Sequence, residues 1–372
     1  MASDPHSQIV IIGAGIIGLD VALVLSERGF GRNITVVAQY LPGDTAPEYT
    51  SPWQVNSGPQ RAGCNFSAIS GTDPNALKWD RAGYMYLGKL AAQSPDQAYV
   101  LRTPSIEYWD EDIPHDKIQT MSEYLEDNHL ILDRKPPFRV LPADKLPAGT
   151  KFGIAFTTLT VNAPKHLDYL YSRLKQQYGV TFVRQSVDSV TAAFADNPTN
   201  TTIKLVFNCT GNAARTLPGV RDVKCYPTRG QVLLAHAENV RTNVMRHGKD
   251  YETYVIPRPL SNGHVVLGGY MQKGNGDYAT YGHETRDILA RTTALTPELC
   301  GGEYQVIAAV SGLRPSREMV MLAGGEKRPV VHNYGAGGTG FQAGYGMALD
   351  AVELAEDVLT DIKRERETRA RL

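Results

Sequence analysis

Residues 9–18 read IVIIGAGIIG, a short apolar run that breaks into three spaced glycines. The β-branched run from Ile9 to Ile12 is typical of a strand buried on both faces of a parallel sheet. Apolar residues then recur at helical spacing until Gly29, and Ile34 to Ala38 supplies a second strand. The stretch therefore predicts a βαβ unit that carries a G-x-G-x-x-G turn, the pattern of dinucleotide binding.

The glycines of this turn predict where the dinucleotide lies. Gly13 allows the tight turn, Gly15 lets the backbone approach a pyrophosphate, and Gly18 permits close packing of the helix. One expected feature is missing, because Gln39 stands about 20 residues further on, where an acidic side chain would bind a ribose hydroxyl. Gln39 is expected to donate or accept a hydrogen bond there instead.

Composition restricts the class of partner. The 372 residues include 38 basic and 39 acidic side chains, so the net charge of −1 offers no general attraction for nucleic acid or an anionic membrane. No apolar run approaches the roughly 18 residues that cross a bilayer. The four cysteines are far apart and form no C-x-x-C, which argues against a disulfide framework and a metal site. Small molecules are therefore the expected partners.

A second glycine-rich turn lies near the C-terminus, where residues 330–348 read VVHNYGAGGTGFQAGYGMA. A turn of this kind presents unpaired backbone N–H groups and the positive end of a helix dipole to a ligand. The stretch resembles the signature of the D-amino-acid oxidase and D-aspartate oxidase family. That signature has an apolar pair, His-Asn-Tyr-Gly, small residues, a glycine, five free residues, and then Gly, any residue and Ala. The resemblance implies that this turn lies beside the pyrimidine ring of a flavin.

The resemblance also implies an α/β (α+β) fold made of two interleaved domains. An FAD-binding domain of Rossmann type is expected to comprise residues 1–92, 159–222 and 306–372. A substrate-binding domain, mainly an antiparallel sheet, is expected to comprise residues 93–158 and 223–305.

Three local patterns within these domains predict particular elements. A helix is expected from about Asn75 to Leu90, and another is expected to begin after Asn162, with the Asn162 side chain as its N-cap. The dipeptide Asn262-Gly263 is a strong hairpin signal between the apolar runs on either side of it.

The family resemblance assigns roles at the substrate. Arg314 is expected to grip the substrate α-carboxylate, because a planar guanidinium offers a carboxylate two parallel donors and stays charged when buried. The Tyr254 hydroxyl is expected to donate a hydrogen bond to the same carboxylate. The carbonyl of Gly338 is expected to accept from the substrate amine, and Gln342 to hold a water.

Five further side chains have expected roles. Tyr251 is a candidate for a tyrosine that closes over the substrate, and Tyr226 competes with it. His332 is interpreted as structural, since hydride transfer from a neutral amine needs no base. Arg258 and Arg317 are interpreted as surface or loop residues that form ion pairs.

The resemblance implies non-covalent FAD as the cofactor, held by segments that are far apart in the chain. The loop that reads Ser-Pro-Trp-Ala-Gly in the family is here interrupted by Gln54 to Arg61, which are expected to bulge outward. The predicted FAD contacts are Gly13, Ala14, Gly15, Ile16, Gly18, Gln39, Ser51, Gly63, Cys64, Asn65, Val187, Cys209, Thr210, Gly211, Gly312, Arg314, Gly337, Gly338, Thr339, Gly340, Phe341 and Gln342.

The activity implied is oxidative deamination of D-amino acids to 2-oxo acids, ammonia and hydrogen peroxide, with molecular oxygen as the second substrate. Neutral or apolar side chains are expected, because Met271 stands where D-aspartate oxidases have arginine. The alternatives are a D-aspartate oxidase, a glycine or sarcosine oxidase of the same fold, a dehydrogenase that passes electrons to a quinone, and a catalytically silent FAD-binding protein.

The last three residues, Ala370-Arg371-Leu372, resemble a peroxisomal address that an import receptor reads. An enzyme that makes peroxide would be expected beside catalase, so a peroxisomal location is predicted. A homodimer is a further expectation, and neither a membrane nor a nucleic acid is expected as a partner.

Overall fold

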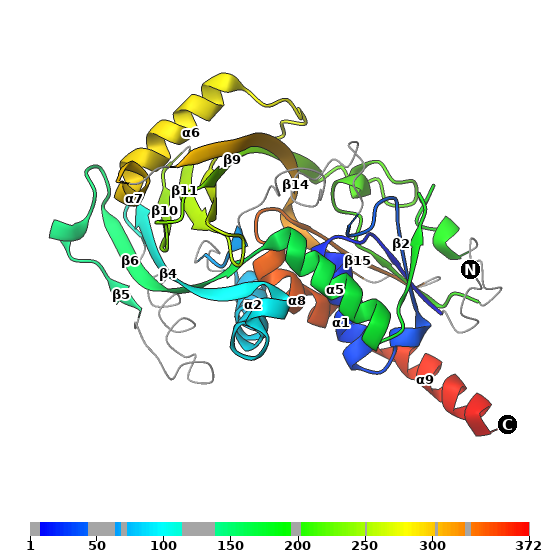
Figure 1. The fold of residues 1–372 in the computed structure, drawn as a ribbon. Helices are drawn as coiled ribbons and strands as arrows, with labels where there is room; N and C mark the ends of the chain where they lie inside the picture. Colours follow the sequence, from blue (N-terminus) through cyan, green and yellow to red (C-terminus); the bar gives the residue numbers. More distant parts are fainter. Residues whose placement is uncertain are drawn as a thin grey trace. The chain divides into compact units, whose positions relative to one another are not determined.

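The computed structural model describes residues 8–43, 64–67, 73–113, 138–194, 202–249, 251–301, 304–323 and 329–371. The chain divides into two compact units (Figure 1). Unit 1 comprises Met1–Asp44, Leu167–Pro227 and Arg314–Leu372, and unit 2 comprises Thr45–His166 and Thr228–Leu313. Both units are therefore assembled from segments that alternate along the chain.

Unit 1 is built on a sheet in which all neighbouring pairs of the five central strands run parallel. The apolar run Ile9–Ile12 lies at its centre, since Ile11 pairs with Val36 on one side and with Phe207 on the other. In spatial order the strands are β15 (Val330–Ala336), β8 (Leu205–Asn208), β1 (Ile9–Ile12), β2 (Ile34–Ala38) and β7 (Thr181–Arg184). β14 (Gln305–Ala323) pairs with β15 in the antiparallel direction.

Two helices of unit 1 pack against one another and against this sheet. α1 (Ile16–Glu27) contacts β1 and β2, and α8 (Gly340–Glu353) contacts β15 and α1. The contact between the helices is close, because a Cβ added to Gly344 would lie 2.5 Å from a carboxyl oxygen of Asp20. The remaining helical segments are α5 (Ala163–Gln177), α9 (Glu356–Arg371), η1 (Gly31–Asn33), η3 (Ala192–Phe194) and η4 (Gly211–Arg215).

Unit 2 contains a mainly antiparallel sheet. In its described pairs only β4 and β10 run parallel. In spatial order the strands are β3 (Cys64–Asn65), β6 (Phe152–Val161), β4 (Val100–Trp109), β10 (Asn243–His247), β11 (Glu252–Pro257), β12 (His264–Gly268) and β9 (Cys225–His236), with β13 (Gln272–Lys273) beside β9 and β5 (Arg139–Val140) beside β6. This confirms the predicted α/β class with an antiparallel part.

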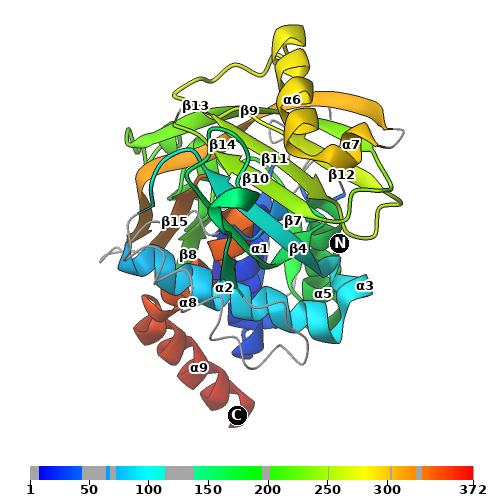
Figure 2. The same cartoon turned by 90° about the vertical axis from the view of Figure 1, so that its left-hand side faces the viewer.

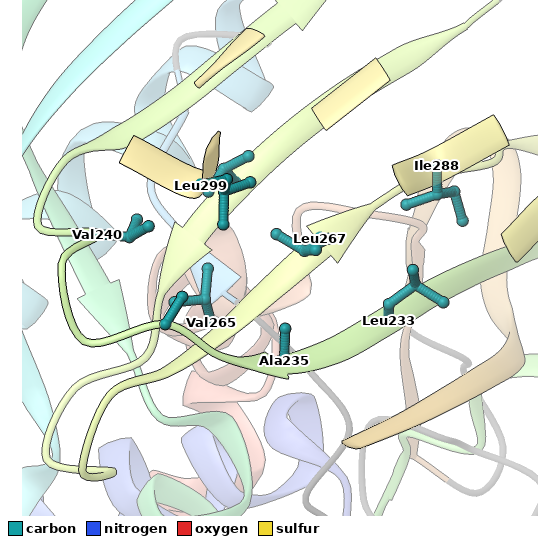
Figure 3. Close-up of a cluster of buried hydrophobic side chains, with 9 residues drawn as sticks. Leu233, Ala235, Val240, Val265, Leu267, Ile288 and Leu299 are labelled. Atoms are coloured by element: carbon teal, nitrogen blue, oxygen red, sulfur yellow. The ribbon is translucent and has the colours of Figure 1, made fainter. Parts of the chain in front are cut away.

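Helices α6 (Gly282–Leu295) and α7 (Pro297–Cys300) cover one face of this sheet (Figure 2). Ile288 of α6 and Leu299 of α7 join Leu233, Val265 and Leu267 of the strands in one buried apolar cluster (Figure 3). The burial of such side chains contributes about 1.5–3 kcal/mol each. The remaining helical segments of unit 2 are α2 (Pro74–Gln93), α3 (Pro95–Ala98) and η2 (Ala143–Lys145).

Three local expectations differ from the structure in detail. The first unit boundary lies at Asp44 rather than at residue 92, because α2 packs on β4 and β6, with the Tyr84 hydroxyl donating to Thr157 O at 3.1 Å. Asn162 precedes α5, but its side-chain amide donates to Pro259 O at 3.0 Å instead of capping the helix. The hairpin at Asn262-Gly263 has a longer loop than two residues, since the ladder ends at Pro257 and Val265.

None of the described helices is both long and apolar enough to cross a membrane.

Candidate FAD and carboxylate site

The glycine turn after β1 has the geometry that a bound pyrophosphate requires. Gly13 has a φ of 111°, and a Cβ added there would lie 2.5 Å from Cys209 O, so only glycine fits. A Cβ at Gly18 would overlap Gly13 O, which shows how closely α1 approaches the turn. Gly15 is the N-cap of α1, and the first turn of the helix carries no acidic residue. The N–H groups at this end are therefore suited to an anion.

The start of α8 lies beside the start of α1. A Cβ added to Gly340, the first residue of α8, would lie 3.5 Å from the Ile16 Cγ2 atom. The first turn of α8 also lacks acidic residues. Two helix N-termini thus present positive dipole ends within one part of unit 1, an arrangement that suits a ligand with phosphates and a second electron-rich group.

Arg314 runs beside the turn that precedes α8. Its side chain belongs to β14, is 9% exposed, and passes within 3.9 Å of the Cβ position of Gly338. The turn is tied to the same strand, because the Gly337 N–H donates to Pro315 O at 2.8 Å. Pro315 in turn lies 3.4 Å from the Cβ position of Gly211. The structure therefore brings together Arg314, Gly337, Gly338 and Gly211, four residues whose roles at a flavin stay a prediction.

A chain of hydrogen bonds connects the predicted FAD contact Thr210 to His332. The Thr210 hydroxyl donates to Asn208 Oδ1 at 2.8 Å, which orients the Asn208 amide so that its nitrogen faces His332 Nδ1 at 3.0 Å. Burial lowers the pKa of His332, so the ring is neutral and Nδ1 accepts this bond. His332 thus connects β15 to the end of β8 by a hydrogen bond, which fits the interpretation that His332 has a structural role.

Tyr254 in unit 2 lies against a pair of glycines. It is 8% exposed and pairs with Gly268 across β11 and β12. A Cβ at Gly268 would overlap the Tyr254 ring, and one at Gly269 would lie 2.6 Å from the Tyr254 hydroxyl oxygen. The backbone of these two glycines therefore forms the surface on which the Tyr254 ring rests.

Cys64 and Asn65 form β3 at the edge of the same unit. The Asn65 amide donates to Met245 Sδ at 3.2 Å, and Met245 is the residue of β10 that pairs with Tyr254. Burial raises the pKa of the Cys64 thiol to about 12, so the thiol is uncharged at neutral pH. Met245 is thus a neighbour of both Asn65 and Tyr254, which are 189 positions apart in the sequence.

Tyr251 is firmly held in unit 2. Its hydroxyl donates to Asp110, which also accepts from Arg246 Nε at 2.7 Å. Its ring fills the space beside Gly248, where an added Cβ would overlap it. Burial and the bond to Asp110 raise the pKa of Tyr251. The proposed closing role of Tyr251 stays a prediction, since its hydroxyl is engaged by the protein here.

Unit 2 also contains a buried network of charged residues around His247 that the sequence did not reveal. His247 is flanked by Glu252 Oε2 at 2.7 Å from Nδ1 and by Glu107 Oε2 at 3.1 Å from Nε2. Burial alone would lower the pKa of His247, but the two carboxylates outweigh it and raise the pKa to about 9. The ring of Trp109 stacks on His247 with centroids 4.7 Å apart. No motif links these residues, because they come from three different strands.

The remaining predicted FAD contacts lie in different surroundings. Gln39 follows β2, is exposed and donates to the Tyr40 hydroxyl at 3.3 Å. Val187 packs on the apolar cluster around Val10 and Ile12, on one face of the parallel sheet. Ser51, Gly63 and the insertion at 54–61 lie outside the described residues. Ala14, Gly312 and Gln342 are buried, whereas Thr339 and Phe341 are partly exposed at the start of α8.

Two arginines that were interpreted as surface residues are buried. Arg317 Nε contacts Asp222 Oδ2 at 2.7 Å with both side chains less than a tenth exposed, and the Tyr334 hydroxyl donates to the same carboxylate at 3.0 Å. Burial alone would raise the pKa of Asp222, but these bonds hold it below its usual value. Arg258 is also buried, which lowers its pKa to about 10. The ion pair of Arg317 was expected, but its burial was not.

Three comparisons place the chain among known proteins. Residues 8–354 match the family described as FAD dependent oxidoreductase. The chain is 42% identical over 357 residues to the D-amino-acid oxidase of Schizosaccharomyces pombe, which covers 94% of this chain and 96% of that one. It is 28% identical to the D-aspartate oxidase of Cryptococcus neoformans, over 94% and 97% of the two chains.

Solved structures show a similar fold. Glycine oxidase from Bacillus cereus aligns with a TM-score of 0.68 and 16% identity, covering 94% of this chain and 95% of that one. L-proline dehydrogenase from P. horikoshii also aligns with a TM-score of 0.68 and 16% identity, covering 95% and 94%. At this level of identity the likeness concerns the fold alone.

Proposed function

The chain belongs to the family of FAD-dependent oxidoreductases, and on this premise we propose that it catalyses the oxidative deamination of D-amino acids. The full-length match to a fungal D-amino-acid oxidase at 42% identity supports this activity. The observation within the structure that carries the proposal is the position of Arg314, a nearly buried guanidinium beside the glycine turn that begins α8.

The residues of unit 1 fit FAD. Gly13 and Gly337 adopt positive φ values and their surroundings leave no room for a Cβ at Gly13, so the backbone itself forms the cradle. The N–H groups at the start of α1 would hold the pyrophosphate, and those at the start of α8 would face the pyrimidine part of the flavin. When bound, FAD supplies the acceptor for the two electrons that leave the substrate.

The task of the chain is to hold the substrate in one orientation. We assign to Arg314 the binding of the substrate α-carboxylate, because a bidentate guanidinium fixes both the position and the plane of a carboxylate. Tyr254 is the second donor to this group, and the Gly338 carbonyl accepts from the amine. Orientation of this kind can contribute roughly 7–11 kcal/mol to lowering a barrier.

The substrates proposed are D-amino acids with neutral or apolar side chains. Met271 is 56% exposed and offers a thioether where an acidic side chain would need a cation. Peroxide as a further product and molecular oxygen as the electron acceptor follow from the same proposal, because the matched fungal relative is an oxidase by name.

A peroxisomal location is a further part of the proposal. Ala370 and Arg371 are the last two residues of the charged helix α9 (Glu356–Arg371), and Leu372 lies outside the described residues. A fluorescent fusion with the tripeptide at its end should accumulate in peroxisomes, and the same fusion without these three residues should stay outside them.

The experiment that tests the activity is reduction of the holoprotein by a panel of amino acids without oxygen. The yellow flavin absorbance should bleach with D-alanine or D-methionine and stay unchanged with the L forms and with glycine. Admission of oxygen should restore the colour and release peroxide. Bleaching by D-aspartate alone would identify a D-aspartate oxidase instead, and bleaching without recovery in oxygen would identify a dehydrogenase.

A further inference from the structure

Arg291, a partly buried residue near the end of α6, donates hydrogen bonds to four acceptors. Its Nη1 donates to Glu252 O at 2.8 Å and to the Thr253 hydroxyl at 2.7 Å. Its Nη2 donates to Gly269 O at 3.2 Å, and its Nε contacts Asp287 Oδ2 at 2.9 Å. One guanidinium therefore connects the start of β11, the residue after β12 and its own helix.

These bonds close a small ring of backbone contacts. The Gly269 N–H donates to Glu252 O at 2.9 Å, and Arg291 donates both to that same carbonyl and to the carbonyl of Gly269. Both polar backbone groups of Gly269 are thus held by fixed partners. Without Arg291, Gly269 keeps only the bond through its N–H, and its peptide plane loses one restraint.

Aromatic rings fix the orientation of the guanidinium itself. The Arg291 Cζ atom lies 5.4 Å from the centroid of the Tyr270 ring and 5.7 Å from that of Tyr251. The Tyr270 hydroxyl donates to Asp287 at 2.7 Å, so ring, carboxylate and guanidinium form one connected group. Lysine would keep the charge but would lack the planar fork that reaches all four acceptors.

The ring of contacts supports Tyr254. The Tyr254 side chain rests on the backbone of Gly268 and Gly269, and a Cβ at Gly269 would lie 2.6 Å from its hydroxyl oxygen. We propose that Arg291 is a positioning residue, which holds the Gly268-Gly269 backbone in place so that the Tyr254 hydroxyl is aimed at the substrate carboxylate. This inference rests on the proposed function, because it takes the role of Tyr254 from it.

Helix α6 does not depend on Arg291 for its own attachment to the sheet. Ile288, one turn earlier, is fully buried in the apolar cluster with Leu233 and Leu267 (Figure 3). Arg286 lies on the same helix but is exposed, and therefore provides a matched control for removal of an arginine from α6.

The test compares R291M, R291K and R286M as FAD-loaded proteins. Benzoate serves as the probe, since it has a carboxylate but no oxidisable Cα–H bond, and its dissociation constant is measured by calorimetry. We expect R291M to bind benzoate on the order of 10-fold more weakly than R286M, because a small displacement of one donor is costly at an oriented site. R291K should lie between them, and the KM for D-alanine should rise in the same order.

FAD content and melting temperature separate positioning from folding. Both should stay close to those of R286M, and benzoate affinity in R291M equal to that of R286M would overturn the proposal. If R291M does not fold, R291K decides in the same way, with unchanged benzoate affinity again as the contradicting result. A wild-type protein that binds benzoate but oxidises no D-amino acid would refute the proposed function and leave the Arg291 comparison valid.

Discussion

Arg314 holds its positive charge in a buried position, where a carboxylate would stabilise it strongly. Its side chain is almost completely buried beside Gly338, and burying a guanidinium costs free energy that a bidentate carboxylate recovers well. We expect R314M to lower kcat/KM for D-alanine by on the order of 100-fold or more, since the substrate loses its orientation. R314K should lose less, because an ammonium group keeps the charge.

The assay for these variants is steady-state peroxide production, with bound FAD measured by absorbance. An R314M protein that keeps both its FAD and the wild-type kcat/KM would remove Arg314 from the substrate site.

Asp20 is a buried carboxyl group that the proposed chemistry does not use. It lies on α1, is 2% exposed, and its Oδ1 atom has no hydrogen-bond partner. Burial, with a smaller effect of Glu27, raises its pKa well above the ordinary value of 3.8. The folded protein therefore binds this proton more tightly than the unfolded chain does, and stability is lost as pH rises above that ordinary value.

We expect D20N to be more stable than wild type at pH 8, because a neutral amide replaces a group that is costly to ionise. The difference should shrink as the pH is lowered to 5, where the carboxyl group costs less. Urea unfolding at the two pH values measures this difference. A difference that does not change with pH would show that the Asp20 carboxyl group has its ordinary pKa.

At the scale of elements, the close packing of α1 against the turn before it depends on Gly18. A Cβ at Gly18 would overlap Gly13 O, so the turn and the first part of α1 cannot keep their separation in a G18A variant. We expect G18A to purify with much less FAD than wild type, as judged by the ratio of flavin to protein absorbance. G282A is a suitable control, because the nearest atom to its added Cβ is a side-chain nitrogen of Arg286 at 3.6 Å. Equal FAD content in G18A and G282A would contradict this account.

The elements themselves could be predicted to different extents from the sequence. Ile9–Ile12 and Ile34–Ala38 were predicted with their observed bounds, because uninterrupted β-branched runs occur mainly in buried parallel strands. The loop at Asn262-Gly263 was predicted as a hairpin but not its length. Both residues have positive φ, at 55° and 80°, yet Leu260 also has a φ of 50°, a conformation that the sequence does not announce.

The site shows the same division. The glycine turns could be predicted because each is a local pattern with a physical reason, whereas the role predicted for Arg314 follows from the resemblance of its segment to the family. Arg291 and the network of His247 with Glu107 and Glu252 could not, because their partners come from strands that are distant in sequence. An arginine on a helix with polar neighbours is normally interpreted as solvated, and only the strand register reveals its acceptors.

The whole molecule should respond to its cofactor as a ligand of the folded state. FAD contacts predicted in unit 1 come from all three of its segments, so binding should stabilise that unit against unfolding. At an FAD concentration 100 times the dissociation constant, the stabilisation is about 2.7 kcal/mol. Calorimetric scans of apoprotein should therefore show a melting temperature that rises with added FAD. Identical scans with and without FAD would contradict binding to the folded state.

The central position of β1 has a consequence for synthesis of the protein. Its neighbour on one side, β8, begins at Leu205, and the next strand along, β15, begins at Val330. β1 is therefore made well before β8, and its second edge stays uncovered until Asn208 has been synthesised. During that interval the unpaired edge of β1 can associate with other chains, so we expect chaperone binding during synthesis to reduce aggregation.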